Sequence, residues 1–212
     1  MLRQLLLALA FGALGALGAW PGARGPDPLA ELAWIAVVAL PCGLACGALD
    51  LRFWPFAVSV PALWMSALAL AGISSERTLA TPLWAALCWS GIFLGGWGLG
   101  RACAASVRTV AAGLVLALAL ALLPSAGAFL GRPWPPPVAA RLLDLSPVSV
   151  CMESAGVDWM RHPAVYEPAG ALDIDPSLRH PWRGKLAGPG LLLLGCLLAW
   201  LSTSTSARFP RS

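Results

Sequence analysis

The chain has 212 residues, of which 58% are hydrophobic and only 11% are charged, and its formal net charge is +4. So large an apolar fraction cannot be hidden in a water-soluble core, because too few polar residues remain to cover the surface. The basic residues are scattered along the chain, which argues against a nucleic-acid-binding stripe. The composition therefore predicts an integral membrane protein that contacts the lipid bilayer and has no nucleic-acid partner.

Six apolar stretches are spaced along the chain. Each is roughly 15 to 22 residues long, enough to cross or nearly cross roughly 30 Å of hydrocarbon at about 1.5 Å per residue. The predicted spans are residues 4–20, 32–49, 53–73, 79–100, 109–130 and 187–201. We therefore predict an all-α integral membrane protein whose fold is a six-helix transmembrane bundle.

The first stretch also has features of a secretory signal peptide. It has a basic start at Arg3, an apolar run, and small residues at Gly18 and Ala19. Trp20 is typical of an interfacial anchor and more spans follow, so we favour an uncleaved first span. Cleavage of residues 1–20 remains the alternative.

The fourth predicted span ends in a glycine-rich run formed by Gly95, Gly96, Gly98 and Gly100. A phosphate-binding loop needs a lysine followed by Ser or Thr after such glycines, and this run lies inside an apolar segment without them. Small residues in membrane helices let two backbones approach closely. The run therefore predicts close helix packing.

Five of the six cysteines fall in or beside apolar segments, and the chain contains no Cys-x-x-Cys motif. The nearest pair, Cys42 and Cys46, has the i,i+4 spacing of a helix, whereas zinc or redox chemistry favours a closer pair. We expect all six to be small core residues.

The arginines in the short loops predict the orientation of the bundle, because cytoplasmic loops are enriched in basic residues. One side carries the N-terminus, the turn at Arg52, the turn between Arg101 and Arg108, and the C-terminal tail. The short loops on the other side carry only Arg24 and Arg77. We therefore predict a bacterial inner-membrane protein with both termini in the cytoplasm.

The positions of the apolar stretches divide the chain into three predicted parts. Residues 1–130 would form the first five spans, residues 131–186 an extracytoplasmic loop, and residues 187–212 the sixth span and a cytoplasmic tail. The loop holds both histidines and six of the ten acidic residues. It is thus the main polar segment of the chain.

The loop is predicted to contain short helices after a stiff, polyproline-like lead over residues 132–137. Residues 138–145 have room for two helical turns. Ser146 followed by Pro147 is typical of a helix start, and His162 before a proline is typical of a helix stop. Apolar residues between them recur at helical spacing while Ser149 and other polar residues point away, which predicts an amphipathic helix on the outer interface or capping the bundle.

No ionisable residue lies in the middle of any predicted span. Ion-coupled transporters and intramembrane proteases keep such groups at membrane depth, so those classes are disfavoured. Haem ligation inside the bundle is disfavoured as well, because neither histidine lies within a predicted span. We predict no catalytic residue, no metal site and no cofactor. The residues predicted to face a substrate or partner lie on the loop helix: Met152, Glu153, Asp158, Trp159 and His162.

Six spans, cytoplasmic termini and an outer helical excursion between the last two spans are similar in outline to the permease subunits of ABC-type exporters. This chain departs from them in having no long segment between spans two and three for an ATPase to dock. The resemblance implies a non-enzymatic membrane subunit of a multicomponent transport or export assembly, with a protein partner such as an ATPase.

Two other hypotheses remain from the sequence. The first is a membrane enzyme at the outer interface, in which His162 acts with Asp158 and Glu153; the chain has no His-Glu-x-x-His spacing to support a metal there. The second is a small-solute-binding subunit in which Trp89 and Trp97 line a pocket.

Overall fold

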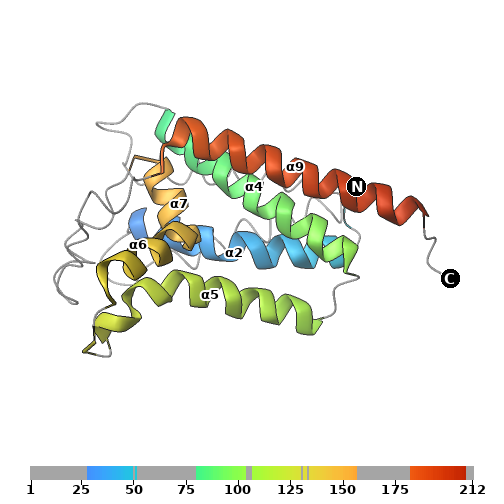
Figure 1. The fold of residues 1–212 in the computed structure, drawn as a ribbon. Helices are drawn as coiled ribbons and strands as arrows, with labels where there is room; N and C mark the ends of the chain where they lie inside the picture. Colours follow the sequence, from blue (N-terminus) through green and yellow to red (C-terminus); the bar gives the residue numbers. More distant parts are fainter. Residues whose placement is uncertain are drawn as a thin grey trace.

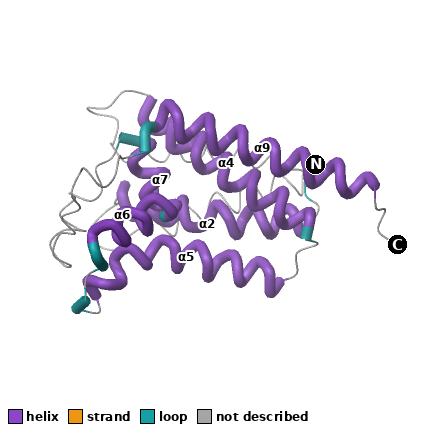
Figure 2. The backbone as a smooth tube through the Cα atoms, in the orientation of Figure 1, coloured by secondary structure: helices purple, strands orange, loops and turns teal. Residues whose placement is uncertain are grey.

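The computed structural model describes residues 28–49, 51, 80–103, 107–129, 131–132, 134–156 and 182–208. Over these residues the regular structure is entirely helical (Figures 1 and 2). The helices are α2 (Pro28–Ala48), α4 (Ala80–Ala102), α5 (Val107–Phe129), α6 (Pro136–Leu145), α7 (Pro147–Ser154) and α9 (Gly184–Arg208). The predicted spans at residues 4–20 and 53–73 lie outside the described residues.

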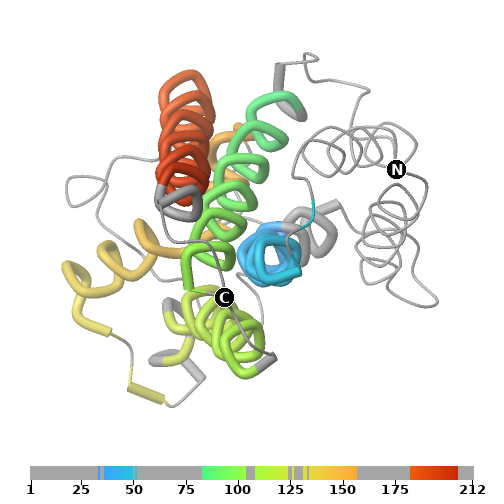
Figure 3. Tube along the Cα trace, turned by 90° about the vertical axis from the view of Figure 1, so that its right-hand side faces the viewer, coloured from blue at the N-terminus to red at the C-terminus, as the bar shows by residue number. Residues whose placement is uncertain are grey.

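Four long helices lie side by side and form the bundle. α4 packs between α2 and α9, and α5 packs against α2 (Figure 3). Along the axis, α5 ends where α2, α4 and α9 begin, and the short helices α6 and α7 lie at that same end (Figure 1). We call this the α7 end of the bundle.

Two helices are long and apolar enough to cross a membrane by length and composition: Leu83–Ala102 within α4 and Gly184–Ser204 within α9. α2 and α5 carry shorter apolar segments, Ala36–Ala48 and Arg108–Leu123. The all-α class is therefore confirmed over the described residues. The bounds of α2, α4 and α5 lie close to those of the predicted spans, whereas α9 continues to Arg208, beyond the predicted end of the last span at residue 201.

Glycines set the contact between α2 and α4. A Cβ on Gly96 would lie 2.6 Å from the carbonyl oxygen of Leu40 and 3.3 Å from the Cα of Gly43. A Cβ on Gly100 would lie 2.9 Å from the Cα of Leu44. Any larger side chain at these positions would push the two backbones apart, so the contact depends on the absence of side chains.

A second glycine face of α4 meets α9. A Cβ on Gly98 would lie 2.8 Å from the backbone of Leu198, and one on Gly91 would lie 2.6 Å from the nitrogen of Leu192. The predicted close packing is thus confirmed for Gly96, Gly98 and Gly100. Gly95 differs, since its nearest neighbour would be a side-chain methyl of Leu198 at 3.6 Å.

Aromatic residues of α4 fill the core between these glycines. Trp89 stacks on Phe93 with ring centroids 5.1 Å apart. The indole N–H of Trp97 donates a hydrogen bond of 2.7 Å to the carbonyl oxygen of Leu51, just beyond α2. The guanidinium of Arg101 lies over the Trp97 ring at 5.3 Å from its centroid, within the range of a cation–π contact.

The cysteines follow the prediction only in part. Cys46, Cys88 and Cys151 are buried and Cys42 is partly buried. The prediction is wrong for Cys103 and Cys196, which are exposed. Cys103 lies in the turn after α4, and Cys196 lies on the face of α9 that turns away from the bundle.

Candidate functional site

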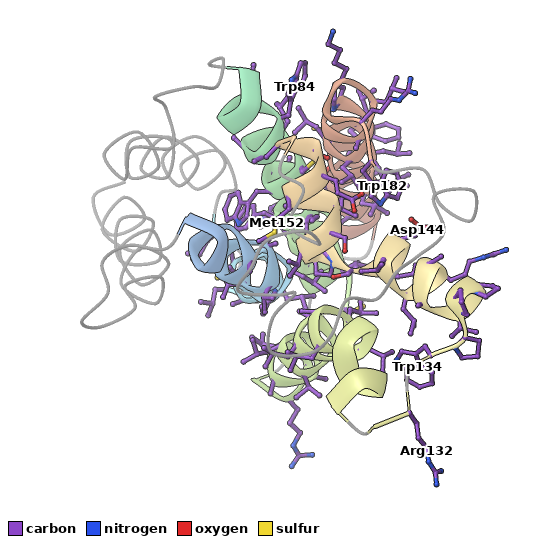
Figure 4. All side chains as sticks on the ribbon, turned by 90° about the vertical axis from the view of Figure 1, so that its left-hand side faces the viewer. Trp84, Arg132, Trp134, Asp144, Met152 and Trp182 are labelled. Atoms are coloured by element: carbon purple, nitrogen blue, oxygen red, sulfur yellow. The ribbon has the colours of Figure 1, made fainter. Side chains whose placement is uncertain are left out.

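The α7 helix is enclosed at one end of the bundle. It contacts α2, α4, α5, α6 and α9 (Figure 4). Six of its eight residues are buried, namely Val148, Ser149, Val150, Cys151, Met152 and Ser154. A short helix in this position closes the end of the bundle where α5 stops and α9 starts.

The start of α7 was predicted and its end was not. Ser146 has the extended conformation of an N-cap and Pro147 is the first helical residue, as the sequence indicates, although the Ser146 side chain makes no cap hydrogen bond. The helix stops at Ser154 instead of continuing to His162. Gly156 has a φ of 70°, a left-handed conformation that glycine adopts without strain and that is common just after a helix.

The predicted amphipathic character of this helix is also wrong for its described part. Ser149, expected to point away from the apolar face, has none of its surface exposed. α7 is buried almost all round and caps the bundle, which is one of its two predicted placements. The neighbouring α6 has the mixed character instead, with Leu143 buried and Arg141 exposed.

The lead into α6 is shorter than predicted. The helix begins at Pro136, and Pro135 just before it has polyproline-like dihedral angles, with φ −53° and ψ 137°. Proline is accepted in the first helical turn because the N–H that it lacks has no partner there. The indole N–H of Trp134 donates a hydrogen bond of 2.9 Å to the carbonyl oxygen of Leu123, which ties the lead to α5.

Three serine hydroxyls of this region are buried without a hydrogen-bond partner among the described residues: Ser146, Ser149 and Ser154. Their exposed fractions are 0%, 0% and 3%. The Ser154 hydroxyl faces the Cys88 thiol of α4, but without the geometry of a hydrogen bond. A buried hydroxyl left unpaired costs about 1–3 kcal/mol, so these serines add no hydrogen bond to other protein groups that would hold α7 in place.

Two thiols belong to the same buried region. Cys151 lies one helical turn before Ser154 and therefore on the same side of α7, the side that meets Cys88. Burial raises the pKa of the Cys151 thiol well above its ordinary value, and the nearby Cys88 adds to this. The protonated thiol is a poor nucleophile, so Cys151 is inert while α7 is seated.

α7 is joined to the start of α9 by one polar contact and one close approach. The carboxylate of Glu153 accepts a hydrogen bond of 2.8 Å from the backbone N–H of Trp182. A Cβ on Gly184 would overlap the carbonyl oxygen of Ser154 and lie 2.8 Å from the Trp84 side chain. The negative charge of Glu153 next to the N-terminus of α9 also interacts favourably with the helix dipole.

Of the five residues predicted to face a substrate or partner, the structure describes two. Met152 is buried, with 3% of its surface exposed, and belongs to the core cluster that joins α7 to α2 and α4 (Figure 4). Glu153 is partly buried and holds the N–H of Trp182. Asp158, Trp159 and His162 lie outside the described residues.

Sequence reasoning missed the serines and Cys88 as members of this region. The signal available was a run of small polar residues, Ser146, Ser149 and Ser154, in a segment otherwise rich in apolar residues. Serine is ordinary on a solvated helix face, so the pattern became informative only when the structure showed that the face is buried.

The tryptophans of the solute-binding hypothesis are packed against protein. Trp89 and Trp97 each have 2% of their surface exposed and belong to one core cluster between α2, α4 and α9. In this structure they fill the core, so a solute would reach them only after the helices separate.

A scan against protein-family models finds no match for this chain, and searches of curated proteins and of solved structures find none either. Among the residues that the structure describes, no three His, Cys, Asp or Glu side chains are grouped to hold a metal ion.

Proposed function

We propose that this chain is a non-enzymatic membrane protein with six spans that serves as the membrane subunit of a transport or export assembly. In this proposal the α7 end of the bundle faces outward, the periplasm in a bacterial inner membrane, and both termini are cytoplasmic. The partner is a protein that supplies energy, such as an ATPase.

The exposed apolar faces of α5 and α9 carry the membrane part of the proposal. Leu186, Leu193 and Trp200 of α9 have 73%, 71% and 63% of their surface exposed, and Val115 and Leu122 of α5 have 66% and 62%. Contiguous apolar faces of this kind are rare on water-soluble monomers. Hydrocarbon solvates them well, while the glycine contacts on the inner faces hold the helices together.

The directions of the helices support the topology. The C-terminal ends of α2, α4 and α9 and the N-terminal end of α5 lie at one end of the bundle (Figure 1). This is the alternation required if residues 53–73 form a further span between α2 and α4. The arginines of the predicted cytoplasmic side, among them Arg101 and Arg108, then lie at the end opposite α7.

The buried polar side chains of the bundle support a transport role in which a partner protein supplies the energy. Buried polar side chains among the described residues are all serines: Ser90, Ser146, Ser149, Ser154 and Ser202. Coupling to protons or ions inside a membrane uses ionisable side chains at membrane depth. A bundle without them in its described interior needs an external source of energy, which favours a subunit that works with an ATPase.

The test is affinity purification of the tagged full chain from membranes in a mild detergent, followed by mass spectrometry. We expect a stoichiometric ATPase in the eluate and retention of the chain in carbonate-washed membranes. An unrelated multi-span protein with the same tag is the control for non-specific capture. A monodisperse chain that elutes without any partner would contradict the transport proposal, and release by carbonate would contradict the membrane proposal.

A further inference from the structure

We propose that α7 is a mobile plug, which seats in the α7 end of the bundle when the chain is closed and leaves that position as a unit when it opens. The idea that α7 gates transport rests on the proposed function. The idea that α7 opens locally is independent of it. The observations that carry it are the enclosure of α7, the form of its two ends, its unpaired hydroxyls and its contact with α9.

The first observation is that α7 occupies the position of a plug. It is a separate helix of eight residues that contacts all four long helices of the described bundle. Its side chains Cys151 and Met152 are 2% and 3% exposed and belong to the same core cluster as Cys88. Removing α7 would therefore uncover the end of α4 around Cys88.

The second observation is that both ends of α7 are suited to rigid-body movement. Ser146 separates α6 from α7 with an extended backbone, φ −73° and ψ 122°. Gly156 follows the helix with a φ of 70°, and a Cβ built there would meet no atom within 4 Å. Glycine is thus used at this position for its backbone conformation and not for close packing. A few residues at element ends absorb the dihedral changes in hinge motions.

The third observation is that the seated position leaves polar groups unsatisfied. The hydroxyls of Ser146 and Ser149 are buried without hydrogen-bond partners among the described residues, and that of Ser154 has the Cys88 thiol beside it. Each would reach water if α7 moved outward. Unpaired hydroxyls destabilise the seated state relative to the open one. Segments that open locally are drawn from the less stable parts of a structure.

The fourth observation is a contact that holds the plug. Glu153 accepts the N–H of Trp182 at the start of α9, and this hydrogen bond has a charged acceptor. We call it the latch. Glutamine at position 153 would keep an oxygen that accepts the same N–H, while alanine would remove it, so the two substitutions separate the latch from the volume of the side chain.

The native cysteines report the movement without added labels. The test is alkylation of the full-length chain in membranes by N-ethylmaleimide, which crosses bilayers, with each cysteine followed by peptide mass spectrometry. Cys151 is part of the plug, and Cys88 lies under it on α4. Cys46 is the internal control, because it is equally buried, at 0%, but lies in the core cluster of α2 and α4 away from α7.

If α7 opens locally, Cys151 reacts roughly tenfold or more faster than Cys46, since opening of the plug is easier than separation of α2 from α4. Glu153→Ala raises the Cys151 rate further, by roughly three- to tenfold, because it removes a charge-assisted hydrogen bond that is partly exposed to solvent. Glu153→Gln gives a rate between those of the wild-type chain and Glu153→Ala, because it keeps the acceptor oxygen but removes the charge. Cys46 does not change.

Equal rates for Cys151 and Cys46 in the wild-type chain would overturn the proposal, because α7 would then open only when the whole bundle does. An equal rise at both cysteines in Glu153→Ala would overturn the latch, since it indicates general loosening. Neither readout uses a partner or transport activity. A chain that purifies alone but labels selectively at Cys151 would refute the proposed function and leave the plug in place.

Discussion

At the scale of single residues, Trp97 shows how one side chain ties two parts of the chain together. Its ring is packed between α2 and α9, its N–H is bonded to the carbonyl of Leu51, and Arg101 lies over its face. Only tryptophan among the aromatic residues supplies both a large ring and an N–H donor. The residue therefore fixes the end of α4 against the turn after α2.

Trp97→Phe should lower the stability of the bundle by about 1–3 kcal/mol, because the carbonyl of Leu51 loses its donor and the core loses volume. Thermal unfolding in detergent, followed by circular dichroism, measures this as a lower Tm. Trp200→Phe is the matched control, since Trp200 is 63% exposed on α9. Equal effects of the two substitutions would contradict the role given to Trp97.

Removing the hydroxyl of Ser149 should not lower stability, in contrast to the substitution of Trp97. Ser149→Ala should leave the Tm unchanged or raise stability by up to about 1 kcal/mol, because no hydrogen bond is lost and an unsatisfied group is removed. Ser202→Ala is the control, since Ser202 is also buried but donates a 2.7 Å hydrogen bond to the carbonyl oxygen of Ala199. It should lower stability by about 0.5–1.5 kcal/mol. A loss at Ser149 as large as that at Ser202 would show that its hydroxyl has a partner.

Residue-level prediction from the sequence succeeded where the signal was local. The N-cap position of Ser146 and the proline at position 147 follow from backbone preferences that need no tertiary information. The burial of Ser149 and the contact between Glu153 and Trp182 were not predicted, because both depend on where α7 sits against α9. Periodicity places a residue on a face of a helix, but it does not say what covers that face.

At the scale of helices, α4 is the element around which the described bundle is built. One of its faces uses Gly96 and Gly100 against α2, and another uses Gly91 and Gly98 against α9. A helix with glycines on two faces can pack closely with two neighbours at once, which explains its central position in Figure 3.

Gly96→Ala should therefore destabilise the bundle by about 1–3 kcal/mol, since the added methyl would lie 2.6 Å from the carbonyl oxygen of Leu40 and must push α2 away. Gly95→Ala is a control in the same helix, because its methyl would meet only a flexible side-chain atom of Leu198 at 3.6 Å. That substitution should be neutral or slightly stabilising, as alanine favours helix by up to about 1 kcal/mol. The measurement is the Tm of each variant in detergent. A Gly95→Ala variant as unstable as the Gly96→Ala variant would contradict the close contact proposed between Gly96 and α2.

Helix bounds were predicted well for the long elements and poorly for α7. Residues 79–100 and 109–130 were expected as spans, and α4 and α5 cover Ala80–Ala102 and Val107–Phe129. Long apolar runs leave few alternatives to a helix. The early end of α7 was missed because the helix was expected to continue to His162, whereas the φ of 70° at Gly156 places that residue after the helix end.

At the scale of the whole molecule, the apolar stretches predicted the all-α class, which is confirmed over the described residues. Membrane insertion, the number of spans, the division into three parts, the orientation and the partner stay predictions. The sequence could not show that residues 131–186 return a helix to the bundle, because α7 has no long apolar run to mark it as a bundle helix. Its contacts with α2, α4, α5 and α9 place it against the bundle.

The account depends most on the chain crossing the membrane with its α7 end outside. Labelling intact cells with a membrane-impermeant maleimide, with peptide mapping of Leu145→Cys and the native Cys103, tests this most directly. Leu145 is 64% exposed on α6 at the α7 end, and Cys103 is exposed in the turn after α4 at the other end. We predict that Leu145→Cys reacts in intact cells and that Cys103 reacts only after permeabilisation. Reaction of Cys103 in intact cells, or protection of Leu145→Cys, would contradict the account.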